Sequence, residues 1–439
     1  MIKTRRKYSK IIMSIFLAGT IAVSSSIAVF AKEVDGKSTS YRTVTEVKDW
    51  GAAITKVVVD LGQPVQQGSV NKDSFSVFVS RSDSRVATPL LGEGYRTITN
   101  AYISDEHGNP ATSGNYAALE MQIGPDVALG SPLNYYNGSN VWIDCNYRVT
   151  QTQDIISGSA KITGLVADSY EGGTRKVVDD FNVEKGTYDG IELNYAEYAP
   201  VKDEKKNPLI IWLHGGGEGG TDATIPISAN KAVSFASQEI QNKFGGAYVL
   251  TPQAPTFWMD GFTKKADGTS KYEKALMQLV KDYVSKNDDV DQNRIYIGGC
   301  SNGGYMTEVM TRDYPKYFAA AFPVCEGLND SLVTDSDIQK IEQTPTWFTC
   351  AKTDKTLPPT INTLPTYDRL VKAGDKNVYL SYFDNVLDTT GLYKKADGTP
   401  YEYNGHWSWI YVYNNQCKTT IDGKETKIMD WMAAQLLKK

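Results

Sequence analysis

A serine framed by glycines, directly after a short apolar run, is the feature that most constrains how this chain folds. Residues 294–304 read RIYIGGCSNGG, and the positions that follow have the spacing of a helix. In a strand–turn–helix of this kind the central serine occupies a strained turn, and the residues two before and two after it must lack bulk. Gly299 and Gly303 meet that condition. The pattern therefore predicts a sheet with Ser301 at the end of one strand, where it is the candidate nucleophile.

The histidines restrict the choice of a base for Ser301. The chain has three of them, His107, His214 and His406. A serine in this kind of turn is followed along the chain first by an acid and then by the histidine. Only His406 lies after Ser301, so we predict that His406 is the general base.

The acid of the triad is chosen by where strands are expected to end. Residues 346–351 read TWFTCA, a β-rich apolar run, and Asp354 follows it at the end where open α/β sheets carry their chemistry. We predict Asp354 as the acid, with Asp384 and Asp388 after the next strand as the alternatives. Three further aspartates precede the strand and are expected to be helix caps or solvated charges: Asp330, Asp335 and Asp337.

A second glycine-rich loop follows another apolar run. Residues 209–220 read LIIWLHGGGEGG, and glycines let backbone N–H groups approach a developing oxyanion without interference from side chains. We predict the donors to be Gly216 and Gly217, together with Asn302 after the nucleophile. A phosphate-binding loop is the alternative, but no Lys-Ser/Thr pair or downstream acid completes such a motif. His214 is expected to brace the loop.

The start of the sequence has the pattern of a secretory signal. Basic residues within the first ten positions precede an apolar run from residue 11, and small residues end it at 29–31. We predict a signal peptide over residues 1–31, a secreted, extracellular protein, and no membrane association after cleavage. The alternative is an uncleaved anchor, because residues 11–31 are about long enough to span a bilayer.

Composition excludes several classes of partner. With 46 basic and 51 acidic residues and a net charge of −5, the chain has no electrostatic footprint for nucleic acid or for an anionic membrane. Three scattered histidines without an HExxH motif predict that no metal takes part in catalysis. We expect no cofactor.

Five cysteines in an exported chain of this length do not form a disulfide framework, and the odd number leaves at least one thiol free. Cys325 and Cys350 end neighbouring predicted strands and are the pair considered for a disulfide. Cys300 adjoins the nucleophile, but Ser301 is the centre of the glycine frame, so a cysteine hydrolase is not favoured.

The chain divides into two regions with different sequence patterns. From about residue 49 to residue 153, apolar and polar residues alternate in short segments separated by Gly, Asn and Pro, which predicts an all-β sandwich. The Gly- and Ser-rich residues 156–173 are the predicted linker. We therefore assign residues 32–160 to the sandwich and residues 161–439 to a catalytic domain.

In the second part, strands alternate with helices, as in α/β proteins. Strands are predicted at 177–183, 191–198, 209–213, 247–250, 294–298, 319–324, 346–351 and 378–383, and helices at 272–286 and 364–373 among others. The first two strands form a hairpin and helices join the rest, which predicts an eight-stranded, mostly parallel sheet. Ser301 then follows the fifth strand, Asp354 the seventh and His406 the eighth.

Several segments together resemble a known family. They are HGGGEGG at 214–220, PQAPTFW at 252–258, GGCSNGG at 298–304, Asp354 after its strand, and NGHW at 404–407. These look like the prolyl-oligopeptidase/dienelactone-hydrolase branch of the α/β-hydrolases. The chain further resembles secreted bacterial esterases with an N-terminal immunoglobulin-like domain, to which WGAAITKV at 50–57 is similar. The resemblance implies an α/β-hydrolase fold preceded by that domain; an insertion at 384–405 departs from it.

The hexapeptide KKADGT occurs at 264–269 and again at 394–399, and Asp-Gly turns are the plain explanation. Because both copies follow segments that end at the catalytic edge of the sheet, a second hypothesis is that they wall the cleft. Four aromatic residues lie near them in sequence: Trp258, Phe262, Trp407 and Trp409. We predict that Trp258 and Trp407 bind substrate, whereas Trp409 is equally a core position of a final helix.

Taken together, the motifs predict a secreted serine carboxylesterase that works through an acyl-enzyme, with acyl or feruloyl esters of carbohydrates as substrates. A small-molecule or carbohydrate-linked ester is its expected partner, and assembly as a homo-oligomer stays open. One alternative is a secreted serine peptidase of the prolyl-oligopeptidase type, because the triad fixes acyl transfer and not the leaving group. The other is a non-catalytic polysaccharide-binding protein that uses the β-sandwich.

Overall fold

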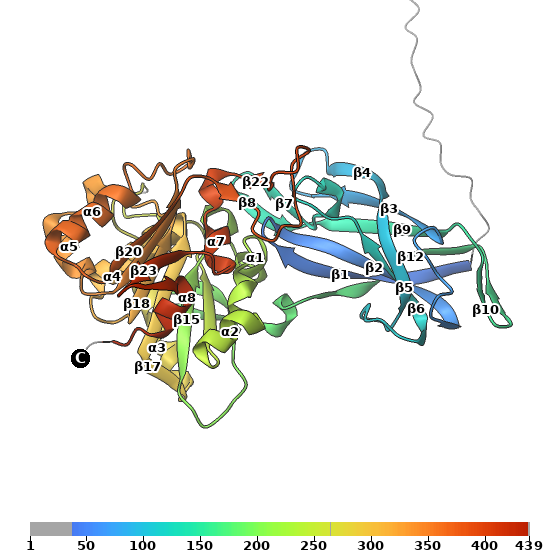
Figure 1. The fold of residues 1–439 in the computed structure, drawn as a ribbon, viewed down its shortest axis with the longest axis horizontal. Coiled ribbons are helices and arrows are strands. Elements are labelled where there is room, and N and C mark those ends of the chain that lie inside the picture. Colours follow the sequence, from blue (N-terminus) through green and yellow to red (C-terminus); the bar gives the residue numbers. More distant parts are fainter. Residues whose placement is uncertain (1–36, 264, 438–439) are drawn as a thin grey trace, which may run out of the picture.

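The structure is a computed structural model that describes residues 37–263 and 265–437. Figure 1 shows two bodies side by side along the long axis, one built mainly of strands and one of strands and helices. The predicted signal peptide, residues 1–31, lies outside the described residues. Within the described part, no helix is long and apolar enough to cross a membrane.

The N-terminal domain is one curled sheet of eight strands in the order β4-β3-β9-β12-β1-β2-β6-β5. Neighbouring strands are antiparallel except β1 and β12, which run parallel. The strands are β1 (Lys37–Lys48), β2 (Gly51–Gln66), β3 (Phe75–Ser82), β4 (Leu90–Arg96), β5 (Ile98–Ser104), β6 (Ser113–Met121), β9 (Asp144–Gln151) and β12 (Leu165–Arg175). Buried and half-buried side chains alternate along β3, and both halves of the sheet contribute to one apolar core. The predicted sandwich is therefore present, with the sheet folded over its own core.

The change from one domain to the next comes later than predicted. β12 extends to Arg175 and lies inside the first sheet, between β9 and β1. The assignment of 156–173 to a linker, and the boundary after residue 160, are therefore wrong. Some of the glycine and serine residues that suggest a linker form a hairpin of β10 (Ile155–Ser157) and β11 (Ala160–Ile162), and others lie on β12 itself. Leu165 and Ala167 then return to the core, but this apolar run is too short to give a clear alternation.

The second domain contains the predicted eight-stranded, mostly parallel sheet, in the order β13-β14-β16-β15-β17-β18-β19-β20. The strands are β13 (Asn182–Tyr188), β14 (Ile191–Tyr198), β15 (Asn207–Leu213), β16 (Tyr248–Gln253), β17 (Val290–Cys300), β18 (Ala320–Val324), β19 (Thr346–Ala351) and β20 (Val378–Phe383). β14 is antiparallel to both β13 and β16, and the remaining pairs are parallel. The first strand begins later than predicted, because residues 178–180 form a 3-10 turn.

Helices cover both faces of this sheet, and the central strand shows why. β15 is buried throughout; Ile210 and Trp212 belong to one apolar core, and Leu209, Ile211 and Leu213 to the other. Successive side chains of a strand point to opposite faces, so a run that is apolar at every position needs cover on both. The helices are α1 (Thr224–Ser228), α2 (Gln238–Phe244), α3 (Glu273–Lys286), α4 (Asn302–Asp313), α5 (Asp335–Ile341), α6 (Thr363–Ala373), α7 (Trp409–Tyr413) and α8 (Ile428–Ala433).

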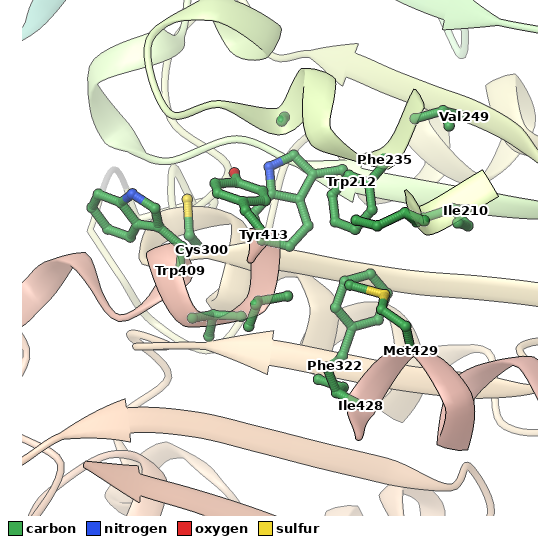
Figure 2. Close-up of a cluster of buried hydrophobic side chains, with 14 of the residues drawn as sticks. Ile210, Trp212, Phe235, Val249, Cys300, Phe322, Trp409, Tyr413, Ile428 and Met429 are labelled. Atoms are coloured by element: carbon green, nitrogen blue, oxygen red, sulfur yellow. The ribbon is translucent and has the colours of Figure 1, made fainter. Parts of the chain in front are cut away.

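The core on the Trp212 face is rich in aromatic side chains. Figure 2 shows Trp212 with Phe235 and Phe322, and with Tyr413 of α7. The ring of Trp212 lies 5.1 to 5.7 Å from these three rings, centroid to centroid. Such contacts stabilise the core beyond the area that they bury, so α7, which directly follows the predicted base, is firmly attached to the sheet.

The two domains are in direct contact at two places. A hairpin of β7 (Leu133–Tyr136) and β8 (Ser139–Trp142) extends from the first domain onto the second, where Trp142 Nε1 donates to Thr224 Oγ1 over 2.8 Å. Nearby, Lys231 pairs with the buried carboxylate of Asp49 over 2.6 Å. A pair with one buried partner resists separation, because breaking it leaves an uncompensated charge.

The insertion at residues 384–405 makes the second contact. It folds as a short arm in which β21 (Val386–Leu387) pairs with β22 (Glu402–Tyr403). The tip of the arm is the Asp-Gly turn of the second KKADGT copy, where Gly398 has φ +83°. Tyr401 donates a hydrogen bond to Asp126 over 2.8 Å, and Tyr393 packs edge-on against Trp50. Asp126 and Trp50 belong to the N-terminal domain. The insertion therefore connects the end of β20 to the loop of His406, and along the way it contacts the N-terminal domain.

Candidate active site

Ser301 lies in the sharp turn between β17 and α4, with φ 58° and ψ −115°. A non-glycine residue adopts such a left-handed conformation only when the surrounding structure imposes it. The flanking glycines are required by packing. A Cβ at Gly299 would lie 2.6 Å from the carbonyl of Gly303, and a Cβ at Gly303 would overlap the carbonyl oxygen of Leu213 on β15. The turn thus holds Ser301 at the carboxyl end of the central strands, as the sequence predicts.

The imidazole of His406 is bonded to the carboxylate of Asp354, with 2.8 Å between Nδ1 and Oδ2. The other carboxylate oxygen accepts the backbone N–H groups of Thr356 and Leu357 over 2.8 and 2.9 Å. Asp354 is 3% and His406 8% exposed. Because an ionised carboxylate only accepts hydrogen bonds, Nδ1 carries the proton and Nε2 is left with a free lone pair. That is the tautomer in which a histidine can take a proton from a serine.

The loop before His406 is closely fitted to the strand end that carries Asp354. Gly405 lies so near Thr353 that a Cβ there would overlap the Thr353 backbone. The side chain of Asn404 accepts the backbone N–H of His406 over 2.9 Å. The segment NGHW therefore sets the base at the end of β19, even though the insertion precedes it.

The alternative acids have other partners. Asp384 is exposed and pairs with Lys352, and Asp388 accepts the hydroxyl of Thr390. Of the three aspartates before β19, Asp337 completes the capping box of α5 with Thr334 and Asp335 is a fully exposed charge, as expected. Asp330 is neither a cap nor a solvated charge, because it is half-buried and pairs with Arg369.

The glycine-rich loop forms a short 3-10 turn, η3 (Gly216–Glu218), at the end of β15. Gly216 and Gly217 line the same cavity as Ser301 and His406. Asn302 is the first residue of α4, where backbone N–H groups have no partner within the helix. Its side-chain Oδ1 accepts the N–H of Met259 over 2.7 Å. The assignment of these three N–H groups as oxyanion donors stays a prediction.

His214 braces the loop, as predicted. Its ring is 1% exposed, with Nδ1 2.6 Å from the carbonyl oxygen of Gly215 and Nε2 accepting the N–H of Ala254 over 3.0 Å. Burial lowers the pKa of His214 to about 4, so the ring is neutral. The neutral ring, with one donor and one acceptor, connects the end of β15 to the loop after β16.

The cavity over Ser301 has a volume of about 550 Å³ and is lined by both domains. The catalytic domain contributes the η3 loop, Ser301, His406, and the aromatic residues Phe257, Trp407 and Trp409. The N-terminal domain contributes Asp49 and Trp50 from the β1–β2 turn, and Tyr135 and Asn140 from the β7–β8 hairpin. The predicted site residue Trp407 therefore does line the cavity.

Trp258 does not line the cavity, and its prediction as a substrate-binding residue is wrong. It is 0% exposed and packs against His214 and Tyr272, with ring centroids 5.2 and 6.0 Å apart. Its neighbour Phe257 points the other way, lines the cavity and is 47% exposed. The two residues begin a turn after β16, closed by the bond from Asp260 N–H to the Phe257 carbonyl oxygen, and the sequence does not show which of them faces the cavity.

The KKADGT copies do not wall the cleft either. The first forms an Asp-Gly turn in which Asp267 accepts the N–H of Thr269 over 3.0 Å, and it packs against α4 through Tyr305. The second is the tip of the arm. Phe262 is 77% exposed and lies outside the cavity lining, whereas Trp409 is both a core residue and part of that lining.

Several residues that line the cavity could not be found from the sequence. Asp49, Tyr135 and Asn140 belong to no motif, and Trp50 belongs only to the segment that resembles the N-terminal domain of esterases; all four reach the site because the two domains dock. Glu218 differs from these four residues because it lies inside the glycine-rich loop. An acidic side chain within a predicted oxyanion loop is the sequence signal by which Glu218 could have been singled out.

The five cysteines are free thiols in the structure, so Cys325 and Cys350 do not form a disulfide. Burial raises the pKa of the Cys300 thiol well above its ordinary value, which removes the thiolate that a cysteine nucleophile needs. In the described part of the chain, no cluster of three or more His, Cys, Asp or Glu side chains could hold a metal ion.

Comparison with known proteins agrees with this architecture. Residues 40–164 match the esterase Ig-like N-terminal domain family, and residues 268–340, which include the turn of Ser301, match the prolyl oligopeptidase family. A solved structure of a thermostable esterase superposes with a TM-score of 0.75 at 24% identity, covering 90% of this chain and 99% of that one. The chain thus has the α/β-hydrolase fold, preceded by a domain that matches the esterase Ig-like family.

Two curated relatives match part of this hydrolase. Poly(3-hydroxyalkanoate) depolymerase C of Paucimonas lemoignei is 28% identical over 151 residues, which cover 32% of this chain and 33% of that protein. Feruloyl esterase B of Neurospora crassa is 32% identical over 124 residues, which cover 28% of this chain and 40% of that protein. The chain thus spans well under half the length of the curated relatives it matches.

Proposed function

We propose that this chain is a secreted serine carboxylesterase that hydrolyses its substrate through an acyl-enzyme. The observation that carries the proposal is the bond between His406 Nδ1 and Asp354 in a cavity that also contains Ser301 in its strained turn. Nucleophile, base and orienting acid are the complete set that acyl transfer requires.

In the proposed reaction, Ser301 Oγ attacks the ester carbonyl while His406 Nε2 takes its proton. The charge that develops on the carbonyl oxygen is held by the N–H of Asn302 and by Gly216 or Gly217. His406 then returns the proton to the leaving alcohol, and Asp354 keeps the imidazole in the required tautomer throughout. Water, activated by the same histidine, releases the acid and regenerates Ser301.

The proposed substrates are acyl or feruloyl esters of carbohydrates. The aromatic lining of the cavity, with Phe257, Trp407 and Tyr135, supports a planar acyl group or a sugar ring. A feruloyl esterase among the relatives is in line with this choice. Secretion is part of the proposal and rests on the sequence pattern of residues 1–31.

The first experiment is labelling of the mature protein with a fluorophosphonate, followed by peptide mass spectrometry. We expect one adduct, on Ser301, which is lost in Ser301→Ala and kept in Ser285→Ala, an exposed serine on α3. Labelling elsewhere, or none in folded protein, overturns the catalytic proposal and favours a binding protein.

Esterase and peptidase activity are then separated by an ester and an amide that share one acyl group. The match to the prolyl oligopeptidase family makes this comparison necessary. A much larger kcat/KM for the ester supports the carboxylesterase; an amide cleaved as fast as the ester supports the peptidase.

A further inference from the structure

Glu218 is a buried carboxyl group in the wall of the catalytic cavity. It is 4% exposed, ends the η3 turn and lines the same cavity as Ser301. Its Oε2 atom is buried and has no hydrogen bond of ordinary geometry in the part of the chain that the structure describes, although Gly215 and Asn230 lie near enough to the carboxyl group to act on it. An oxygen left in this way costs free energy unless something in the cavity binds it.

The surroundings of Glu218 do not neutralise its charge. The N–H of Gly215 and the side chain of Asn230 lower the pKa of the carboxyl, and no cation is among the groups that act on it. Burial outweighs both and raises the pKa of Glu218 to about 7. The proposed mechanism gives this group no task, although it lies in the wall of the site.

A second unpartnered polar atom lies in the same wall. The indole Nε1 of Trp409 is buried and has no acceptor in the described chain, and Trp409 lines the cavity. A Cβ at Gly215 would lie 3.0 Å from Glu218 Oε2 and 3.5 Å from Cys300 Sγ, so the carboxyl and the thiol are close together. Cys300, Trp409 and Tyr413 belong to the same buried cluster, and Figure 2 labels all three side chains.

The two open atoms differ in kind when Glu218 is ionised. Glu218 Oε2 then needs a donor, whereas an indole N–H needs an acceptor. A hydroxyl group supplies both from one oxygen. An ammonium supplies donors only, and it would leave the indole without a partner.

The acyl part of the ester suits this wall better than the alcohol part. In the proposed reaction the alcohol leaves, and water must reach the acyl-enzyme from the side that the alcohol vacates. The acyl group stays bound to Ser301 and can occupy a closed part of the cavity. Glu218 and Trp409 are almost fully buried, whereas Phe257 and Tyr135, 47% and 64% exposed, mark the open side.

We propose that Glu218, with Trp409 Nε1, binds a hydroxyl group on the acyl part of the substrate, so that the enzyme selects hydroxyl-bearing acyl esters. This rests on the proposed esterase function and adds the residue that sets its acyl specificity. Aliphatic hydroxyacyl and phenolic acyl groups share the chemistry that this pair recognises.

The test compares kcat/KM for p-nitrophenyl esters in pairs that differ by one hydroxyl. The pairs are alkanoyl and terminally hydroxylated alkanoyl esters over a series of chain lengths, and cinnamoyl and 4-hydroxycinnamoyl esters. We expect at least one pair in which the wild-type protein favours the hydroxylated ester about ten-fold or more. A ratio near one for every pair overturns the proposal and leaves water as the occupant of this wall.

Variants assign the preference to the two residues. Glu218→Leu and Trp409→Phe should each bring the ratio towards one, because each removes one hydrogen-bonding atom. Glu308→Gln is the control: Glu308 is a buried glutamate on α4 that shares a hydrogen bond with Glu326 and lies outside the cavity lining, and its ratio should equal the wild-type one. If Glu218→Leu lowers kcat/KM equally for both members of a pair, Glu218 only braces the loop and the proposal falls.

The failure of this proposal differs from the failure of the proposed function. Equal turnover of both esters, with Ser301 labelled by the fluorophosphonate, rejects hydroxyl recognition and keeps the esterase. No turnover of either ester and no labelling of Ser301 rejects the esterase itself. If Glu218→Leu does not fold, the kcat/KM ratio of the wild-type protein and that of Trp409→Phe still test the proposal.

Discussion

Asn140 of the N-terminal domain donates a hydrogen bond from Nδ2 to the carbonyl oxygen of Gly217, over 3.3 Å, in the loop predicted to hold the oxyanion. Gly217 has no room for a side chain on that face, since a Cβ would lie 3.1 Å from Asn140 and from Tyr135. The loop is thus held from one side by its own domain, through His214, and from the other by the β7–β8 hairpin.

We expect Asn140→Ala to lower kcat/KM by up to about ten-fold, because one hydrogen bond to a loop carbonyl is lost and the loop N–H groups are less well oriented. Ester kinetics with one good substrate measure this. The melting temperature should change little, and Asn100→Ala, an exposed asparagine on β5, is the control. Unchanged kinetics in Asn140→Ala would mean that the hairpin does not hold the loop.

The bond between His406 and Asp354 predicts a large effect of Asp354→Asn. An amide in place of the carboxylate can present its N–H₂ to the ring and favour the tautomer with the proton on Nε2, which cannot accept a proton from Ser301. We expect kcat to fall by about 10⁴-fold. Asp384→Asn, at an exposed side chain paired with Lys352, should retain activity; an equal loss in both variants would contradict the assignment of the acid.

The turn of Ser301 predicts that Gly303→Ala destabilises the protein by more than about 2 kcal/mol. The new Cβ would overlap the carbonyl oxygen of Leu213, which belongs to the central strand and cannot move away. Thermal unfolding and soluble yield measure the effect. Gly92→Ala serves for comparison, since a Cβ there meets only a side-chain atom of Leu129 at 3.9 Å, and its melting temperature should stay near that of the wild type.

Burial raises the pKa of Glu218 from 4.5 to about 7, which makes stability depend on pH. Between these values the folded protein keeps a proton that the unfolded chain has lost, so the free energy of unfolding falls as the pH rises through this window. Glu218→Gln does not titrate and avoids the loss. We expect the melting temperature of Glu218→Gln minus that of the wild type to increase from about pH 4.5 to about pH 7 and then level off.

The full difference corresponds to about 3 kcal/mol for the pKa change of this one group. Other titrating groups affect both proteins alike and cancel in the comparison. A difference that is constant across the window would show that Glu218 keeps an ordinary pKa in the folded protein.

The local chemistry of the site could be predicted because each part of it is written in a short segment. Ser301 needs glycines on both sides, His406 has no rival after the serine, and Asp354 follows a run that is apolar at every position. The glycines and the strand end are requirements of backbone geometry within a few residues, whereas His406 follows from its place in the chain order; the catalytic roles of the three residues stay predictions. In the structure Ser301 follows β17, Asp354 follows β19, and His406 contacts Asp354 from the 3-10 turn at 405–407.

The rest depends on contacts between segments far apart in the chain. Trp258 and Phe257 are equal candidates in the sequence, and only the packing of His214 against Trp258 decides which one lines the cavity. Asn140 and Trp50 reach the site because the two domains dock. The hydrophobic periodicity of the sequence does not predict this docking. The predicted domain boundary is too early for the same reason. β12 can be recognised as part of the first sheet only from its pairing with β1.

The arm at residues 384–405 rests on Asp126 and Trp50, and it leads directly into the loop of His406. During synthesis the N-terminal domain is made first, so the arm meets a surface that can already be folded when the arm leaves the ribosome. The placement of His406 is therefore coupled to a surface of the other domain. We expect a second domain that is separated from the N-terminal domain to lose these supporting contacts next to the loop of His406.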